Sequence, residues 1–231
     1  MTHPIISELE SLQNATDATA KQKFFKTGES QYGYGDSFLG IRNPVLHTLS
    51  KKYKNITIED IQHLLTHRYH EARHLALLIL VLQYKKAAAQ QQEDIAHFYL
   101  AHSQYINNWD LVDGSCYHII GPYFFSRDRT KFYSLAASPS MWERRIAIVS
   151  TLHFIRHEQF DDTLKLASML LDDPEDLIHK ATGWMLREMG KRNEAVLLKF
   201  LDENLPKMPR TALRYAIEKL SKSLRQDYMS R

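Results

Sequence analysis

Trp109-Asp-Leu-Val-Asp113 is the stretch that best reveals how this chain folds. Trp109 belongs to a series that repeats about every 36 residues, and its other members are Arg73, Arg145 and Ala181. A second column of the same register is apolar or small throughout: Leu75, Leu111, Ala147 and Gly183. Because equivalent positions of stacked repeats share one surface, the pattern predicts a row of similar helical units.

The helix signals around this stretch fall into pairs. The second helix of successive pairs is expected to begin near residues 71, 107, 143, 179 and 211. Solenoids of two-helix repeats have periods of about 33 to 47 residues. We therefore predict an all-α protein, an α-solenoid over residues 1–231 as a single domain, with a concave face built from one helix of each pair.

Capping signals set the expected helix boundaries. Asn43-Pro44 starts a helix after a glycine-rich loop over 28–43, and Thr16 or Asp17 caps an earlier one. Thr57-x-x-Asp60 has the form of a capping box with aspartate in place of glutamate. Further helices are expected over 4–10, 69–86, 90–103, 107–120, 128–136, 140–156, 160–171, 175–190, 194–204 and 210–226.

Composition limits the class of protein. The net charge is only +3, so a nucleic-acid surface would require clustered rather than bulk charge. Cys116 is the single cysteine, which excludes an intramolecular disulfide and favours a reducing compartment. The longest strongly apolar run, residues 75–82, is far shorter than the roughly 20 residues of a membrane span. With no signal peptide at the start of the sequence, we expect a soluble cytoplasmic protein that does not engage membranes.

Two indoles, a carboxylate and a guanidinium share one phase of the repeat. Asp113 follows Trp109 by one helical turn, and Trp184 lies three residues after the last member of the series. Adjacent helical residues point about 100° apart, so only one of Arg144 and Arg145 can lie on the same face as Trp109. The period of the repeat places Arg145 there. One wall with these four groups would suit a cationic sugar flanked by phosphates. The alternative for each residue is structural: core tryptophans, an aspartate in an ion pair or a helix cap, and a surface arginine.

His70-Glu-Ala-Arg-His74 matches the H-E-x-x-H pattern of zinc peptidases, in which two histidines bind zinc and the glutamate acts as base. Arg73 occupies a position that is normally uncharged, and the sequence offers no convincing third ligand. We therefore assign no metal site, and a zinc hydrolase that uses His70, Glu71 and His74 is only a third hypothesis.

Four segments resemble the AlkD-like family of DNA alkylation repair proteins, which are built from HEAT-like helical repeats. The segments are Tyr34-Gly-Asp-Ser-Phe-Leu-Gly-Ile41, Asn108-Trp-Asp-Leu-Val-Asp113, Trp142-Glu-Arg-Arg-Ile-Ala-Ile-Val149 and Ala181-Thr-Gly-Trp-Met-Leu-Arg-Glu188. The resemblance covers about residues 20–220. It implies a HEAT-like solenoid whose concave face binds DNA.

The resemblance also implies an activity, because active members of the family are glycosylases that release positively charged alkylpurines such as 3-methyladenine and 7-methylguanine. It implies that Trp109 and Trp184 pack on the deoxyribose of the lesion, that Asp113 is the catalytic carboxylate and that Arg145 contacts the DNA backbone. The lesion would stay in the base stack instead of being flipped out. Further DNA contacts are expected from Arg73, Tyr34, Arg144 and Lys191.

The expected partner is double-stranded DNA that contains alkylated bases, bound by a monomer without cofactor or metal. Some relatives lack excision activity, so the main alternative is a non-catalytic HEAT-like DNA-binding or scaffold protein. Salt-dependent duplex binding distinguishes a DNA-binding protein from a protein scaffold.

Overall fold

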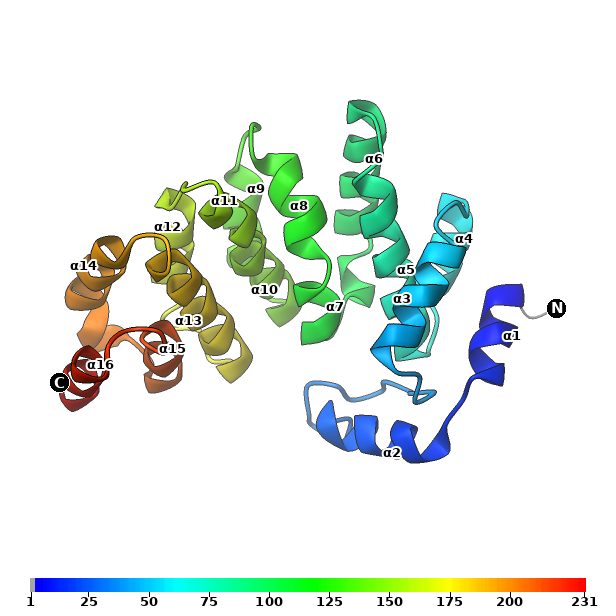
Figure 1. Cartoon of the computed structure of the whole chain (residues 1–231), viewed down its shortest axis with the longest axis horizontal. Helices are drawn as coiled ribbons and strands as arrows, with labels where there is room; N and C mark the ends of the chain where they lie inside the picture. Colours follow the sequence, from blue (N-terminus) through cyan, green and yellow to red (C-terminus); the bar gives the residue numbers. More distant parts are fainter. Residues whose placement is uncertain (1–2) are drawn as a thin grey trace. The chain divides into compact units, whose positions relative to one another are not determined.

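The computed structural model describes residues 3–231, and within this range it contains helices and one isolated bridge between Ser37 and Tyr69, with no strand (Figure 1). The all-α prediction is confirmed. The chain divides into two compact units, residues 1–115 and 116–231. The prediction of a single repeat domain over the whole chain stays a prediction.

The first unit contains α1 (Pro4–Ser11), α2 (Ala15–Phe24), α3 (Asn43–Lys52), α4 (Ile58–Leu65), α5 (His70–Tyr84), α6 (Ala89–Ala101), η1 (Ser103–Tyr105) and α7 (Trp109–Asp113). The second contains α8 (Cys116–Phe124), α9 (Thr130–Ala136), α10 (Met141–Ser150), α11 (Leu152–Arg156), α12 (Asp161–Met169), α13 (Asp176–Gly190), α14 (Glu194–Asn204), η2 (Leu205–Lys207), α15 (Arg210–Ala216) and α16 (Lys222–Ser230).

The helix pairing expected from the period is present in both units. In the first, α4 packs against α5; in the second, α9 packs against α10 and α12 against α13. The helices α5, α7, α10, α13 and α15 each begin within about three residues of the position that the repeat predicts. The helices of these units are therefore repeats of one two-helix pattern.

Local capping explains where several helices begin. Thr57 and Asp60 form the expected capping box, in which the Thr57 hydroxyl accepts from the Asp60 N–H at 3.2 Å and the Asp60 carboxylate accepts from the Thr57 N–H at 3.3 Å. The cap of α2 is Asn14, whose side-chain oxygen accepts from the Asp17 N–H at 3.0 Å. Thr16 and Asp17 were therefore the wrong cap, because Asn14, two to three residues earlier, already accepts from a free N–H group of the first turn.

Three expected helices are each divided in two. The helix expected over 107–120 is interrupted at Gly114-Ser115, that over 140–156 at Thr151, and that over 210–226 before α16. The hydroxyls of Ser115 and Thr151 donate to carbonyls of the preceding turn, at 2.6 Å in both cases, and such bonds compete with the helical pattern. The expected continuous helices were wrong at these points, and α7 is left as a helix of five residues.

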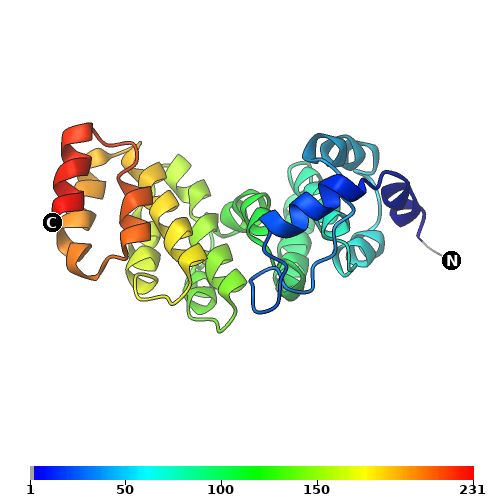
Figure 2. The same cartoon turned by 90° about the horizontal axis from the view of Figure 1, so that it is seen from below.

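Gly183 lies where α13 approaches α15 most closely. A Cβ atom at this position would lie 2.6 Å from the Tyr215 Cβ and would overlap the Ala212 carbonyl oxygen. The two helices lie side by side in both views (Figures 1 and 2). A glycine inside a helix costs about 1 kcal/mol relative to alanine, and here it permits a helix contact directly behind Trp184.

Two further observations concern the interior and the membrane. Cys116 is a fully buried free thiol. Among residues 3–231, no helix combines the length and apolar character that crossing a membrane would require.

Candidate active site

Trp109 and Asp113 are the first and last residues of α7, one helical turn apart. The helix starts at the buried Asn108, whose side-chain oxygen accepts from the Trp109 N–H at 2.9 Å. The amide nitrogen of the same side chain donates to the Asp36 carboxylate at 3.2 Å. Asn108 therefore fixes the start of α7 against the loop that precedes α3. The side chains of Trp109 and Asp113, which α7 carries, are only half-buried.

The indole of Trp109 packs against aromatic rings from the end of α2. Phe25 stacks on it with ring centroids 5.4 Å apart and an interplanar angle of 24°, and Phe24 meets it edge-on at 5.9 Å. Phe38 stacks behind Phe25 at 5.1 Å. Such offset-stacked and edge-on contacts fix ring orientation. Trp109 is thus half-buried and packs against the cluster of Ala18, Phe25 and Phe38. Its contact with a sugar stays a prediction.

A buried ion-pair network lies beneath α7. His70 places its Nε2 2.8 Å from the Asp110 carboxylate and its Nδ1 3.2 Å from the Asp36 carboxylate. Arg73 donates to the other Asp36 oxygen at 2.5 Å. Two carboxylates and two cations balance each other, as buried charges require. The network joins α5, α7 and the 28–43 loop, and so it holds Trp109 and Asp113 in place.

Arg73 therefore has a structural role. Its side chain is 5% exposed, and in addition to Asp36 it donates to the carbonyls of His67 and Arg68 at 3.2 and 3.3 Å. The guanidinium is thus already engaged by the protein, and this geometry does not favour Arg73 as a ligand for a phosphate. A DNA contact through Arg73 stays a prediction.

Glu71 anchors the same loop from α5. Its fully buried carboxylate accepts from the backbone N–H groups of Leu39, Gly40 and Ile41 at 2.9 to 3.2 Å and from Lys21 Nζ at 3.2 Å. Gly40 has φ +82°, and a Cβ there would lie 2.5 Å from the Ala18 nitrogen, so the turn requires glycine. With both oxygens bonded in this way, Glu71 is not placed to act as the base of a zinc peptidase.

The structure places a third residue able to ligate a metal, Asp110, beside His70 and His74. Ligand atoms of His70, His74 and Asp110 lie within 4.8 Å of one another. The repeat could have indicated this, because Asp110 follows His74 by one period of about 36 residues. However, both ring nitrogens of His70 are bonded to carboxylates, and the charges of the network balance without a cation. The absence of a metal site stays a prediction.

The network predicts opposite titration of its two histidines. Burial alone would lower the pKa of His70, but hydrogen bonds to Asp110 and Asp36 outweigh it and raise the pKa above the ordinary value. Burial lowers the pKa of His74 to about 4. At neutral pH we expect His70 to be charged and His74 neutral. NMR titration of the imidazole signals from about pH 4 to about pH 9 measures both.

These pKa shifts determine how the stability of the folded protein depends on pH. The stabilisation from charged His70 is complete below its unfolded pKa of about 6.5 and is lost as the pH rises through the raised folded value. His74 has the opposite effect: between about pH 6.5 and pH 4 it binds a proton in the unfolded state but not in the folded state, so the folded state loses stability as the pH falls through this range. A His70 signal that titrates below about pH 6.5 would contradict the network.

In the second unit, the two arginines at the start of α10 are both held by the protein. Arg144 donates to the two Asp173 oxygens at 2.6 and 3.2 Å and to the Ser138 and Pro139 carbonyls at 3.0 Å. Arg145 is 5% exposed and donates to the Leu177 carbonyl. A DNA contact through either arginine remains a prediction, and this geometry favours neither as an open phosphate ligand.

Trp184 lies on α13 and is half-buried. Its indole N–H donates to the Glu188 carboxylate at 3.2 Å, and Lys191 pairs with the same carboxylate oxygen at 2.7 Å. The indole borders a hollow of about 200 Å³ lined by Tyr117, Leu152, Ile155, Arg156, Trp184, Glu188 and Arg192. Trp184 is thus half-buried beside the cationic side chains of Arg156 and Arg192, and its contact with a sugar stays a prediction.

The remaining expected DNA contacts are exposed. Tyr34 is 68% exposed on the 28–43 loop, and Lys191 is exposed although it pairs with Glu188. Both could reach a ligand without rearrangement of the core. Trp109, Asp113 and Tyr34 belong to the first unit, whereas Arg144, Arg145, Trp184 and Lys191 belong to the second. The prediction that residues of both units line one wall stays a prediction.

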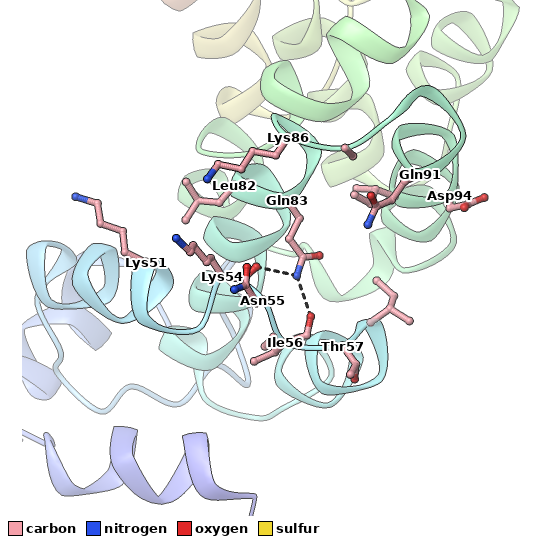
Figure 3. Close-up of a pocket in the computed structure, with 13 residues that line it drawn as sticks. Lys51, Lys54, Asn55, Ile56, Thr57, Leu82, Gln83, Lys86, Gln91 and Asp94 are labelled. Atoms are coloured by element: carbon pink, nitrogen blue, oxygen red, sulfur yellow. Dashed lines mark hydrogen bonds between the residues drawn. The ribbon is translucent and has the colours of Figure 1, made fainter.

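A larger hollow of about 800 Å³ lies elsewhere in the first unit, where the ends of α3 and α5 meet the first turns of α4 and α6 (Figure 3). Lys51, Lys54 and Lys86 border it, and the Gln83 amide donates to the Lys54 and Ile56 carbonyls at 3.1 and 2.9 Å. None of the expected site residues lines this hollow. Size alone therefore does not identify the functional site.

Comparisons with known proteins agree with the fold and the motifs. The model of the DNA alkylation repair enzyme family matches residues 5–220. A solved structure, described as a predicted DNA alkylation repair enzyme from Enterococcus faecalis, has 18% sequence identity and a TM-score of 0.69, over 91% of this chain and 97% of that chain. No curated protein matches. The family match spans nearly the whole chain, and we conclude that the chain belongs to the DNA alkylation repair enzyme family.

Proposed function

We propose that this protein is a DNA glycosylase that hydrolyses the N-glycosidic bond of positively charged alkylated purines, of the 3-methyladenine and 7-methylguanine type, in double-stranded DNA. The observation that supports this most strongly is the Trp109–Asp113 pair on α7. An indole and a carboxylate one turn apart, half-buried and fixed by a charge-balanced network, provide an environment for a cationic reaction centre.

The charge of the lesion determines what the protein must supply. A cationic alkylpurine leaves as a neutral base, so the reaction needs no general acid, in contrast to ordinary glycoside hydrolysis. The sugar becomes oxocarbenium-like as the bond breaks. Asp113 would stabilise that charge and orient or deprotonate the attacking water. The water oxygen bonds to the anomeric carbon, the bond to the base nitrogen breaks with its electron pair, and one proton is released.

The tryptophans would act on the same sugar. The stacked Phe25 prevents the Trp109 indole from turning away, so its accessible part stays ready for a deoxyribose. Trp184 would provide the second indole, with its N–H held by Glu188. Contacts with sugar and backbone do not require extrusion of the base, so we propose excision without base flipping. We further propose that the protein acts as a cytoplasmic monomer without metal or cofactor.

Base release from methylated duplex DNA tests this proposal directly. We expect the wild type to liberate free 7-methylguanine or 3-methyladenine, measured by chromatography, and to bind duplex DNA with an affinity that falls as salt rises. Salt-dependent binding with no base release would support the alternative, a non-catalytic DNA-binding relative. Neither release nor binding at low ionic strength would leave only a protein scaffold.

A further inference from the structure

We propose that Arg156 and Arg192 form a phosphate subsite beside Trp184, and that they bind the backbone phosphates attached to the sugar that packs on this indole. This inference rests on the proposed function, which places a deoxyribose at Trp184. Both arginines line the same hollow of about 200 Å³ as the indole. All groups in this subsite belong to the second unit.

The two guanidiniums are free to take a ligand. Arg156 ends α11, and Arg192 follows α13; both side chains are exposed. Among residues 3–231, no side chain forms an ion pair with either of them. Arg156 lies over the Tyr117 ring at 4.9 Å, a cation–π contact that orders the side chain and leaves its N–H groups available.

The one carboxylate in the hollow is already compensated. Glu188 pairs with Lys191 at 2.7 Å, lies 3.5 Å from Arg187 and accepts the Trp184 N–H. Its negative charge therefore has partners outside the Arg156–Arg192 pair. The two arginines remain as uncompensated positive charge next to an aromatic surface, an arrangement that attracts an anion.

The chemistry of DNA then selects the anion. A deoxyribose carries a phosphate on its 3′ oxygen and another on its 5′ oxygen, so a sugar on Trp184 brings both within reach of long side chains. Guanidiniums bind phosphate oxygens in bidentate geometry, and such charge-assisted hydrogen bonds are stronger than neutral ones. This role differs from that of Arg144 and Arg145, whose guanidiniums are held by the protein itself.

A phosphate-neutralisation experiment tests the subsite. The ligand is a duplex with one tetrahydrofuran abasic analogue, prepared either with natural phosphates or with methylphosphonates on both sides of the analogue. Binding of both duplexes is measured for the wild type, for the double variant Arg156→Gln/Arg192→Gln and for Lys165→Gln. Lys165 is an exposed cation of α12 in the same unit, outside the hollow, and so controls for overall charge.

We expect neutralisation of the two phosphates to weaken wild-type binding about tenfold or more, as loss of charged hydrogen bonds implies. In the double arginine variant the same change should cost less than about twofold, because the partners of these phosphates are gone. Lys165→Gln should retain the wild-type penalty. The proposed subsite would be refuted if the double variant lost as much affinity on phosphate neutralisation as the wild type does, or if the wild type lost none.

The outcome separates this inference from the glycosylase proposal. If the wild type releases no base but its phosphate penalty disappears in the arginine variant, the subsite stands and the glycosylase does not. If base release is normal and the penalty is unchanged in the variant, only the subsite is refuted. A wild type that does not bind the natural duplex overturns both.

Discussion

Asp113→Asn is expected to lower the single-turnover rate of 7-methylguanine release by at least about a hundredfold, because the substitution removes the negative charge opposite the developing oxocarbenium ion. Asparagine has almost the same shape, and Asp113 is only half-buried at the end of α7, so we expect the fold to persist. The measurement is base release from methylated duplex DNA with enzyme in excess over lesions.

A control must separate the site from a general loss of charge. Asp172→Asn removes one exposed carboxylate of the second unit and should leave the rate within about twofold of wild type. Thermal melting should also be similar for both variants. If Asp113→Asn releases base at the wild-type rate, another group performs the chemistry and the assignment of Asp113 is wrong.

Glu71→Ala is expected to lower the free energy of unfolding by about 3 kcal/mol or more. The substitution leaves three backbone N–H groups, those of Leu39, Gly40 and Ile41, without their acceptor, and Lys21 without its carboxylate. Removal of one partner of a buried ion pair costs about 3 to 5 kcal/mol. The measurement is equilibrium denaturation followed by tryptophan fluorescence, in which Trp109 reports on the loop that Glu71 anchors.

The matched control is Glu59→Ala, which removes an exposed glutamate of α4 in the same unit and should change stability by no more than about 0.5 kcal/mol. Glu71→Gln should fall between the two, because its amide retains one acceptor oxygen for the loop. Glu71→Ala with wild-type stability would mean that the loop does not depend on this carboxylate.

Sequence and structure agree on the helical class, on the repeat and on part of the capping. The all-helical class and the capping box at Thr57–Asp60 follow from signals within one or two turns of a helix, and the pairing of helices follows from the period of about 36 residues. Gly183, which the repeat places in an apolar or small column, lies where α13 approaches α15 closely. The pair Trp109 and Asp113 needed only the helical spacing.

Only the tertiary structure decided which charged side chains form ion pairs with other residues of the protein. Asp36 and Arg73 are 37 residues apart, and His70 and Asp110 are 40 apart, yet these four side chains form one buried network. The periodic pattern placed Arg73 on a DNA-binding face, but it could not show that Asp36 takes up its guanidinium. The same holds for Arg144, whose partner Asp173 is 29 residues away.

The physical reason is the range of the interactions. Helical spacing and caps depend on residues within one or two turns, and a repeat can be recognised from positions along the chain. The sequence by itself therefore determined an all-α repeat with an indole and a carboxylate on one turn of α7. Burial and ion pairing depend on which distant segments meet, and buried charges take whichever partners lie within hydrogen-bonding distance. Packing therefore decided that Arg73 and Glu71 hold the loop, and that Arg156 and Arg192 remain free beside Trp184.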